Sequence, residues 1–198
     1  MRIAKTILFA LLIALPVALH AQAVPAGGGG FGGGLGEGEV PRAEMGLNYN
    51  YLHANAPPGQ CGCFSLNGGS AAIVVNLRPS WSAVADITVA HANQVDGTAQ
   101  NITIIDYLFG PRYTWRRNSR YVPYGQILLG GAKEDVNFQF TINRNSFGVS
   151  AGGGVTTRLS PRIGVNIVQL DWIYTQIPNA RNNRQNDLRA ATGFIYRF

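Results

Sequence analysis

The sequence has few cysteines, few charged residues and, after its N-terminus, no long apolar run. Cys61 and Cys63 are its only two cysteines, and a structural zinc site needs four ligands, so they do not make one by themselves. An oxidising compartment would permit a Cys61–Cys63 disulfide, in a small and strained ring. The other interpretation is a pair of loop cysteines without a catalytic role. The missing apolar run excludes a transmembrane helix beyond the N-terminal segment.

Charge is also sparse, because only 13% of the residues are charged, with 16 basic against 10 acidic side chains. Loss of an N-terminal signal containing Arg2 and Lys5 would lower the formal charge from +6 to +4. Lys133 is then the only lysine, and the other basic residues are arginines dispersed along the chain. Dispersed arginines in an exported protein fit nucleic-acid binding poorly, so we expect no nucleic-acid partner.

The N-terminus has the features of an export signal followed by a linker. Residues 1–23 combine a positive start, an apolar stretch at 6–19 and a small-x-small cleavage site at 21–23, which predicts a secretory signal peptide and not a helical anchor. Residues 24–42 are rich in glycine and predict a flexible periplasmic leader. They lack the preceding strand and the Gly-Lys-Ser/Thr of a phosphate-binding loop. Residues 43–198 remain as one domain.

From residue 43 onward, apolar and polar residues alternate with a period of two, which is the side-chain geometry of a β-strand. A parity slip near Ile167 and Val168 predicts a β-bulge, and 133–144 is predicted to be a loop or a hairpin extension. Short connections follow the second, fourth and sixth strands, and no helix-like stretch intervenes. The pattern predicts an all-β, eight-stranded antiparallel up-and-down transmembrane β-barrel. Its strands are expected at residues 44–53, 71–78, 81–91, 102–115, 121–132, 146–158, 162–175 and 187–198.

The two faces of these strands differ in chemistry, and the difference favours a membrane barrel over a soluble lipocalin-like one, whose outer face would be polar. Aromatic residues near the strand ends are expected to form girdles at the membrane interfaces. These residues are Trp81, Tyr113, Trp115, Tyr121, Trp172 and Tyr174, together with Tyr196 and Phe198. The opposite face is expected to fill the lumen with a polar network of Asp86, Asp106, Arg112, Gln126, Arg158, Asp171 and Arg189. Because an unpaired buried charge is costly, we predict the ion pairs Asp86–Arg112 and Asp171–Arg189.

The C-terminus carries a resemblance to a known family. Gly193, Tyr196 and Phe198 follow a pattern of glycine, two residues, an aromatic, one residue and a terminal aromatic. With the stretch 107–113, they make the chain resemble the small OmpA-like outer-membrane β-barrel family. The resemblance implies that these three residues are the signal read by the outer-membrane assembly machinery. Ala191 stands where the family usually has a polar residue.

The resemblance also implies a bacterial outer-membrane location, with outer-membrane lipid and lipopolysaccharide as partners. An even strand number places both termini in the periplasm. We expect a monomer, without the peptidoglycan-binding domain of two-domain members of the family and without their tethering to the cell wall.

An eight-stranded barrel is just wide enough for side chains to fill it, so the expected role is envelope integrity or surface interaction. Loops 54–68 and 176–186 are the candidate interaction surfaces, and their arginines suit lipid phosphates. A narrow channel for ions or small solutes is the alternative. A lipid A-modifying enzyme is less favoured. His53 and His91 are the only histidines after the signal peptide, and the sequence places no nucleophile and no acid at a spacing from them that indicates a catalytic site. We expect no enzymatic activity, no cofactor and no metal.

Overall fold

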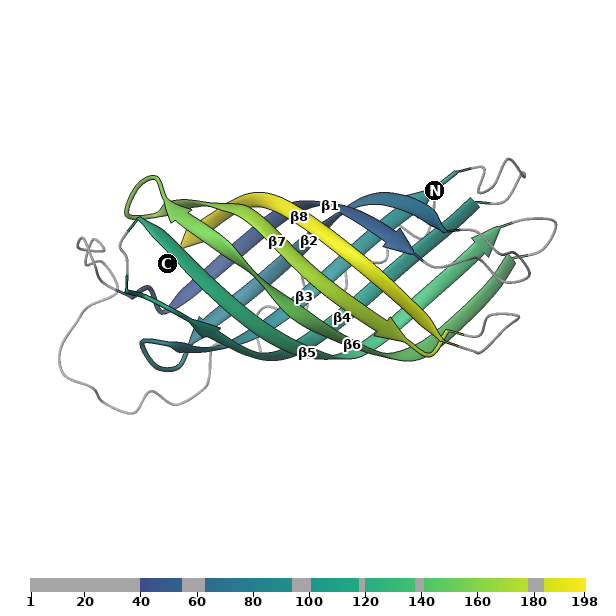
Figure 1. Ribbon diagram of the computed structural model, residues 1–198, viewed down its shortest axis with the longest axis horizontal. Coiled ribbons are helices and arrows are strands. Elements are labelled where there is room, and N and C mark those ends of the chain that lie inside the picture. Colours follow the sequence, from purple (N-terminus) through teal and green to yellow (C-terminus); the bar gives the residue numbers. More distant parts are fainter. Residues whose placement is uncertain (1–39, 55–62, 94–100, 118–119, 138–140, 178–183) are drawn as a thin grey trace. The chain divides into compact units, whose positions relative to one another are not determined.

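The computed structural model describes residues 40–54, 63–93, 101–117, 120–137, 141–177 and 184–198, which form a closed barrel of antiparallel strands (Figure 1). Each strand pairs with its neighbours in the sequence, and the last pairs with the first, as an up-and-down barrel requires. The predicted signal peptide and most of the predicted leader lie outside the described residues. The strands are β1 (Ala43–Ala54), β2 (Phe64–Asn76), β3 (Trp81–Ala92), β4 (Asn101–Thr114), β5 (Tyr121–Asn137), β6 (Thr141–Arg158), β7 (Ile163–Thr175) and β8 (Gln185–Arg197).

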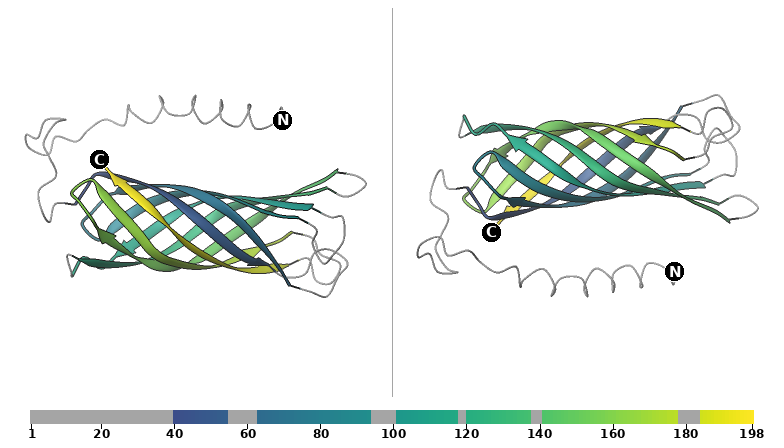
Figure 2. Two further views of the ribbon diagram at one scale, coloured as in Figure 1. Left: turned by 90° about the horizontal axis from the view of Figure 1, so that it is seen from above. Right: turned by 90° about the horizontal axis from the view of Figure 1, so that it is seen from below.

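The two ends of the barrel are distinguished by their connections (Figure 2). One end, called the short-turn end below, holds the turns at 77–80, 115–120 and 159–162, the start of β1 and the end of β8. These turns are closed by backbone hydrogen bonds, such as Trp81 N to Arg78 O at 3.2 Å. The other four connections lie at the opposite end, called the loop end. Among the residues that the structure describes, no helix has the length and apolarity to cross a membrane.

The predicted bounds of β2, β5 and β6 are wrong. β2 begins at Phe64 and not at residue 71, because Phe64 and Leu66 alternate inward and are buried. β5 and β6 continue as a paired hairpin through most of the stretch 133–144, with Asn137 opposite Thr141, so that stretch is the hairpin extension and not a loop. The other strands agree with the expected ranges to within two residues.

The alternation of faces is confirmed along the barrel wall. In β3, every second residue from Trp81 to His91 is exposed, and the residues between them are buried. The predicted bulge is also confirmed, because the registers of β7 with β6 and with β8 both shift between Asn166 and Gln169. Ile167 and Val168 therefore both point outward, each 41% exposed. The bulge lets β7 keep an apolar outer face on both sides of the parity slip.

The predicted aromatic residues all lie on the outer face. Tyr113 packs edge to face on Trp81 and on Trp115 at the short-turn end, with ring centroids 5.1 and 4.9 Å apart. At the same end, Tyr196 and Phe198 are 5.0 Å apart. Trp172 and Tyr174 pack at 6.2 Å toward the loop end of β7. Edge-to-face contacts between neighbouring rings fix the orientation of this outer aromatic surface.

Candidate functional site in the barrel lumen

The centre of the lumen is occupied by an ionic group that we call the Arg189 cluster, formed by Arg189, Asp171, Asp86 and Thr88. Arg189 lies on β8 and is fully buried. Its Nε and Nη2 donate to Asp171 Oδ2 at 3.0 and 2.9 Å, and its Nη1 donates to Asp86 Oδ1 at 2.8 Å. Nη1 also donates to Thr88 Oγ1, whose hydroxyl donates to Asp86 at 3.0 Å. The predicted Asp171–Arg189 pair is thus confirmed, and Asp86 joins it from β3.

A chain of amides links the Arg189 cluster to the short-turn half of the lumen. Gln169 donates to Asp171 at 2.7 Å, and Gln126 donates to the other carboxylate oxygen at 3.3 Å. The oxygen of Gln126 in turn accepts two hydrogen bonds from Arg112, at 3.0 and 2.7 Å. The Arg112 guanidinium also lies over the Tyr124 ring, 4.1 Å from its centroid. Nearly every donor and acceptor of this chain therefore has a partner within the lumen.

The predicted Asp86–Arg112 pair is wrong. In the register of β3 with β4, Asp86 stands opposite Leu108, whereas Arg112 stands opposite Ser82, four residues away along the strand. Arg112 therefore binds Gln126 on β5, and Asp86 binds Arg189 from across the barrel. Sequence parity placed both side chains inside, but the choice of partner depends on the register.

The other predicted lumen residues also face inward. Asp106 is buried on β4, and its Oδ1 has no hydrogen-bond partner. Arg158, at the end of β6, lines a cavity at the short-turn end. Within the part of the chain that the structure describes, no group of histidine, cysteine and acidic residues has an arrangement suited to a metal ion.

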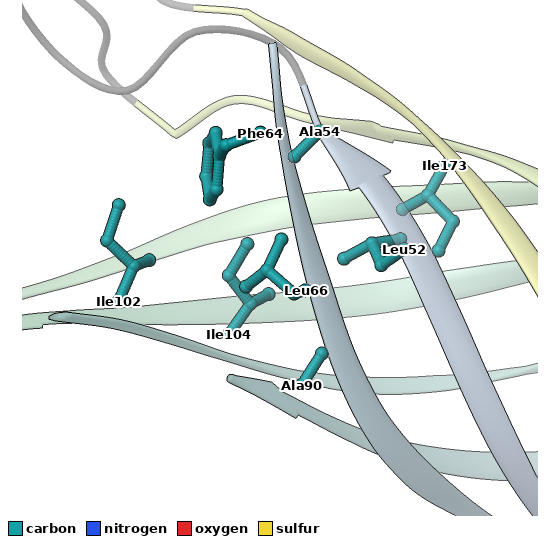
Figure 3. Packing of buried hydrophobic residues seen from close by; sticks show 8 residues of the cluster. All are labelled: Leu52, Ala54, Phe64, Leu66, Ala90, Ile102, Ile104 and Ile173. Atoms are coloured by element: carbon teal, nitrogen blue, oxygen red, sulfur yellow. The ribbon is translucent and has the colours of Figure 1, made fainter. Parts of the chain in front are cut away.

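At the loop end, a group of apolar side chains packs inside the lumen, and we call it the apolar plug (Figure 3). Glu134, Gln185 and Asp187 are also buried toward this end. The members of the plug come from five strands and are buried against one another. The sequence reasoning missed it, since it expected a polar network throughout the lumen. Alternation at the ends of β1 and β4 contained the signal, because it places Leu52, Ile102 and Ile104 inward. The plug consists of Leu52, Ala54, Phe64, Leu66, Ala90, Ile102, Ile104 and Ile173.

The short-turn end is hollow instead. A cavity of about 330 Å³, called the arginine cavity below, opens there. Its charged lining consists of Arg112, Arg116, Arg117, Arg158, Arg197 and Glu44. A pocket of about 20 Å³, roughly the space of one water molecule, shares Glu44, Arg112 and Tyr124 with it. The lumen thus changes along the barrel from a basic cavity, through the Arg189 cluster, to the apolar plug.

His53 and His91 both lie on the outer face near the loop end. His53 Nδ1 is 3.3 Å from Ser65 Oγ, which is also 2.7 Å from the Tyr51 hydroxyl. His91 contacts Thr103 at 2.8 Å and Asn93 at 2.7 Å. Catalysis by a serine–histidine pair needs an acid to orient the histidine. Neither histidine has a hydrogen bond to a carboxylate among the described contacts.

The remaining predictions fall wholly or partly outside the described residues. Cys63 is exposed, but Cys61 is not among the described residues, so the disulfide stays a prediction. The same holds for the interaction loops, because 55–62 and 178–183 are not described. Residues 64–68, which we expected in the first of these loops, belong to β2.

Comparison with known proteins gives a likeness in structure alone, since no family model and no curated protein matches the chain. Neisserial surface protein A superposes with a TM-score of 0.62 at 14% identity, over 79% of this chain and 97% of that one. Ail of Yersinia pestis, solved with the heparin analogue sucrose octasulfate, gives 0.53 at 13%, over 79% and 99%. OprG of Pseudomonas aeruginosa gives 0.51 at 12%, over 80% and 97%. These likenesses show the fold of a small outer-membrane barrel.

Proposed function

We propose that this chain is an outer-membrane β-barrel whose role is structural or surface-interacting, with a closed lumen. The observation that carries the proposal is that apolar side chains face outward and charged side chains face inward, the opposite of a soluble protein. Leu47, Phe109 and Phe194 are 54, 65 and 67% exposed on three different strands, while Asp86 and Arg189 are buried inside. An apolar surface that continues around a barrel suits lipid and would aggregate in water.

The two ends of the barrel differ in the length of their connections, and this difference supports an orientation of the barrel in the membrane. Short turns face the periplasm in outer-membrane barrels, and longer loops face outward. We therefore propose that the short-turn end, with the beginning of β1 and the end of β8, faces the periplasm. The loop end would face lipopolysaccharide and other cells. Surface interaction agrees with the names of two structural neighbours, a surface protein and an attachment invasion locus protein.

The contents of the lumen favour this role over conduction. A solute moving along the axis would have to displace the Arg189 cluster and then the apolar plug. Breaking a buried ion pair costs several kcal/mol, on the order of 3–5, and an apolar constriction adds a further barrier. A closed lumen agrees with the filled interior expected for an eight-stranded barrel.

The location is tested by cell fractionation together with gel migration. The protein should appear in the outer-membrane fraction, and the detergent-purified protein should migrate differently on gels before and after boiling, because a closed barrel resists detergent. Recovery in the soluble fraction, without any shift on boiling, would refute the proposal.

The closed lumen is tested by recording current across a planar bilayer. We expect no steady conductance from the wild-type protein. A steady conductance that is lost in Arg112→Ala would support the narrow channel instead. The same recording on Arg120→Ala controls for the loss of one positive charge, since Arg120 lies over the outward ring of Tyr121 at 5.7 Å.

We also propose that the chain is not an enzyme. The nearest approach to a catalytic arrangement is His53 beside Ser65, and neither is held by an acid among the described contacts. Mass spectra of lipid A from cells that overexpress the protein should match those of cells without it. A changed acyl chain pattern that disappears in Ser65→Ala would contradict this proposal.

A further inference from the structure

The arginine cavity has more positive than negative charge in its own lining. Its lining holds five arginines and one glutamate, a formal excess of four positive charges. Glu37 and Glu39, outside the described residues, precede Val40 in the sequence; counting both still leaves an excess of two. Elsewhere in the lumen the buried charges are mostly acidic: Arg189 pairs with Asp86 and Asp171, and Asp106, Glu134 and Asp187 are buried as well. The excess is therefore local to the short-turn end.

Glu44 does not satisfy the arginines that surround it. Arg116 Nη2 and Arg197 Nε lie 3.9 and 4.0 Å from its carboxylate, beyond hydrogen-bond distance. Glu44 Oε1 accepts from Asn76 instead, at 3.4 Å. The Arg197 side chain is largely buried, and its Nη1 has no hydrogen-bond partner. A buried charged donor without an acceptor is costly, so this site favours an added acceptor.

Two of the other guanidinium groups, those of Arg116 and Arg112, are held in place by the protein. Arg116 donates to Pro79 O at 2.6 Å and to Asn76 Oδ1 at 3.1 Å. Arg112 is fixed by Gln126 and by the Tyr124 ring. Burial lowers the pKa of Arg116, and the positive charges of Arg158 and Arg112 lower this pKa further. The negative charge of Glu44 acts in the opposite direction and raises the pKa. Arginine remains protonated in spite of the lowered pKa, so the site keeps its charge.

We propose that the arginine cavity is a binding site for a small phosphate-bearing anion. Guanidinium groups pair with phosphate through two parallel hydrogen bonds, and several of them suit a group with three charged oxygens. Arg112, Arg158 and Arg197 come from three strands, β4, β6 and β8, and Arg116 and Arg117 come from the turn after β4. The volume of about 330 Å³ accommodates inorganic phosphate or a compact phosphate ester.

The position of the cavity favours a soluble ligand over a lipid headgroup. Its strand residues, such as Arg112, Thr114 and Tyr124, belong to the inward parity, so the site opens at the mouth of the lumen and not toward the lipid-facing wall. With the apolar plug at the other end, the ligand would enter and leave through the short-turn end. The site therefore binds without conducting.

Isothermal titration calorimetry of the detergent-purified full chain with inorganic phosphate tests the proposal. We expect saturable binding that exceeds any response to chloride, and a loss of affinity of roughly tenfold or more in Arg158→Gln and in Arg197→Gln. Arg120→Gln removes the same charge from the turn that carries Arg116 and Arg117, but at a residue outside the cavity lining, and should bind as the wild type does. Boiling-dependent gel migration checks that each variant is folded.

Arg117→Gln keeps the test decisive if the two inner variants fail to assemble, because Arg117 is exposed at the cavity rim. It should weaken phosphate binding, whereas Arg120→Gln should not. A parallel titration with short-chain phosphatidylglycerol should give no saturable response. The proposal is overturned if wild-type protein does not bind phosphate saturably, if Arg117→Gln and Arg120→Gln weaken it equally, or if only the lipid binds.

Discussion

Arg189 and Asp171 stand directly opposite each other in the register of β7 with β8, and two guanidinium nitrogens lie 2.9 and 3.0 Å from one carboxylate oxygen. Asp86 approaches the same guanidinium from β3, a strand that pairs with neither β7 nor β8. The contact therefore bridges the lumen from wall to wall. It joins parts of the barrel that the hydrogen-bond ladder connects only through intervening strands.

Replacing Arg189 by methionine should destabilise the barrel strongly. The substitution keeps much of the side-chain volume but leaves Asp86 and Asp171 buried without their cation, at a cost of about 3–5 kcal/mol. Urea unfolding of protein reconstituted in lipid vesicles measures the change. The triple variant Asp86→Asn, Asp171→Asn, Arg189→Met should recover part of the loss, because it removes the uncompensated charges. An unchanged unfolding midpoint in Arg189→Met would contradict the structural role of the cluster.

The partner of Asp86 can be identified by double-mutant cycles. Asp86→Asn combined with Arg189→Gln should show a coupling of about 0.5–3 kcal/mol, because these side chains are in contact. Asp86→Asn combined with Arg112→Gln should show a clearly smaller coupling, because Arg112 reaches Asp86 only through Gln126, Asp171 and Arg189. The reverse result would restore the pair that sequence parity predicts.

These two pairs show what the sequence can and cannot determine about the lumen. Alternation assigns each side chain to a face, because successive residues of a strand point to opposite sides of the sheet. It therefore predicts correctly that Asp86, Arg112 and Arg189 are internal. The pairing of charges depends on register and on which walls face each other across the lumen, and neither is encoded in the spacing along one strand. The prediction from adjacent strands succeeded for Asp171–Arg189 because the register of β7 with β8 places these two residues opposite each other.

The start of β2 was missed for a different physical reason. Asn67, Gly68 and Gly69 have the composition of a turn, yet all three lie within the strand and pair with β1 and β3. At Gly68 the neighbouring strand comes so close that a Cβ atom would lie 1.9 Å from the carbonyl oxygen of Val89. Gly68 thus allows two backbones to approach closely. Amino-acid composition alone does not distinguish a glycine with this role from a glycine in a turn.

Adjacent glycines in β2 provide a matched pair of substitutions. Gly68→Ala should destabilise the barrel by about 1–3 kcal/mol, because its Cβ would overlap the backbone of β3. Gly69→Ala should be tolerated, since its nearest contact is Asn48 O at 3.4 Å and the position faces outward. Urea midpoints of the two variants test the difference. Equal midpoints would mean that the backbones of β2 and β3 do not approach as closely as described.

The arginine cavity and the apolar plug also depend on arrangement and not on any local motif. The arginines of the cavity are 85 residues apart at the extremes, from Arg112 to Arg197, and only barrel closure brings them to one mouth. The plug similarly combines the ends of β1, β3 and β7 with the starts of β2 and β4. Sequence alternation predicts which side chains face inward. The arrangement of the strands in the barrel determines where along the lumen they lie, in a basic, an ionic or an apolar layer.

Deleting Phe198 should impair insertion into the outer membrane far more than it alters the stability of the barrel once formed. Phe198 is exposed beyond the end of β8, where its ring packs edge to face on Tyr196 at 5.0 Å. Its loss removes little internal packing, but it removes the last aromatic of the predicted assembly signal. Quantifying folded protein in the outer membrane, by gel migration without boiling, measures insertion. Phe194→Ala, which truncates an exposed aromatic of the same strand outside the aromatic positions of the signal, serves as the control. Equal amounts of folded protein with and without Phe198 would refute its role in assembly and leave it as an interfacial aromatic alone.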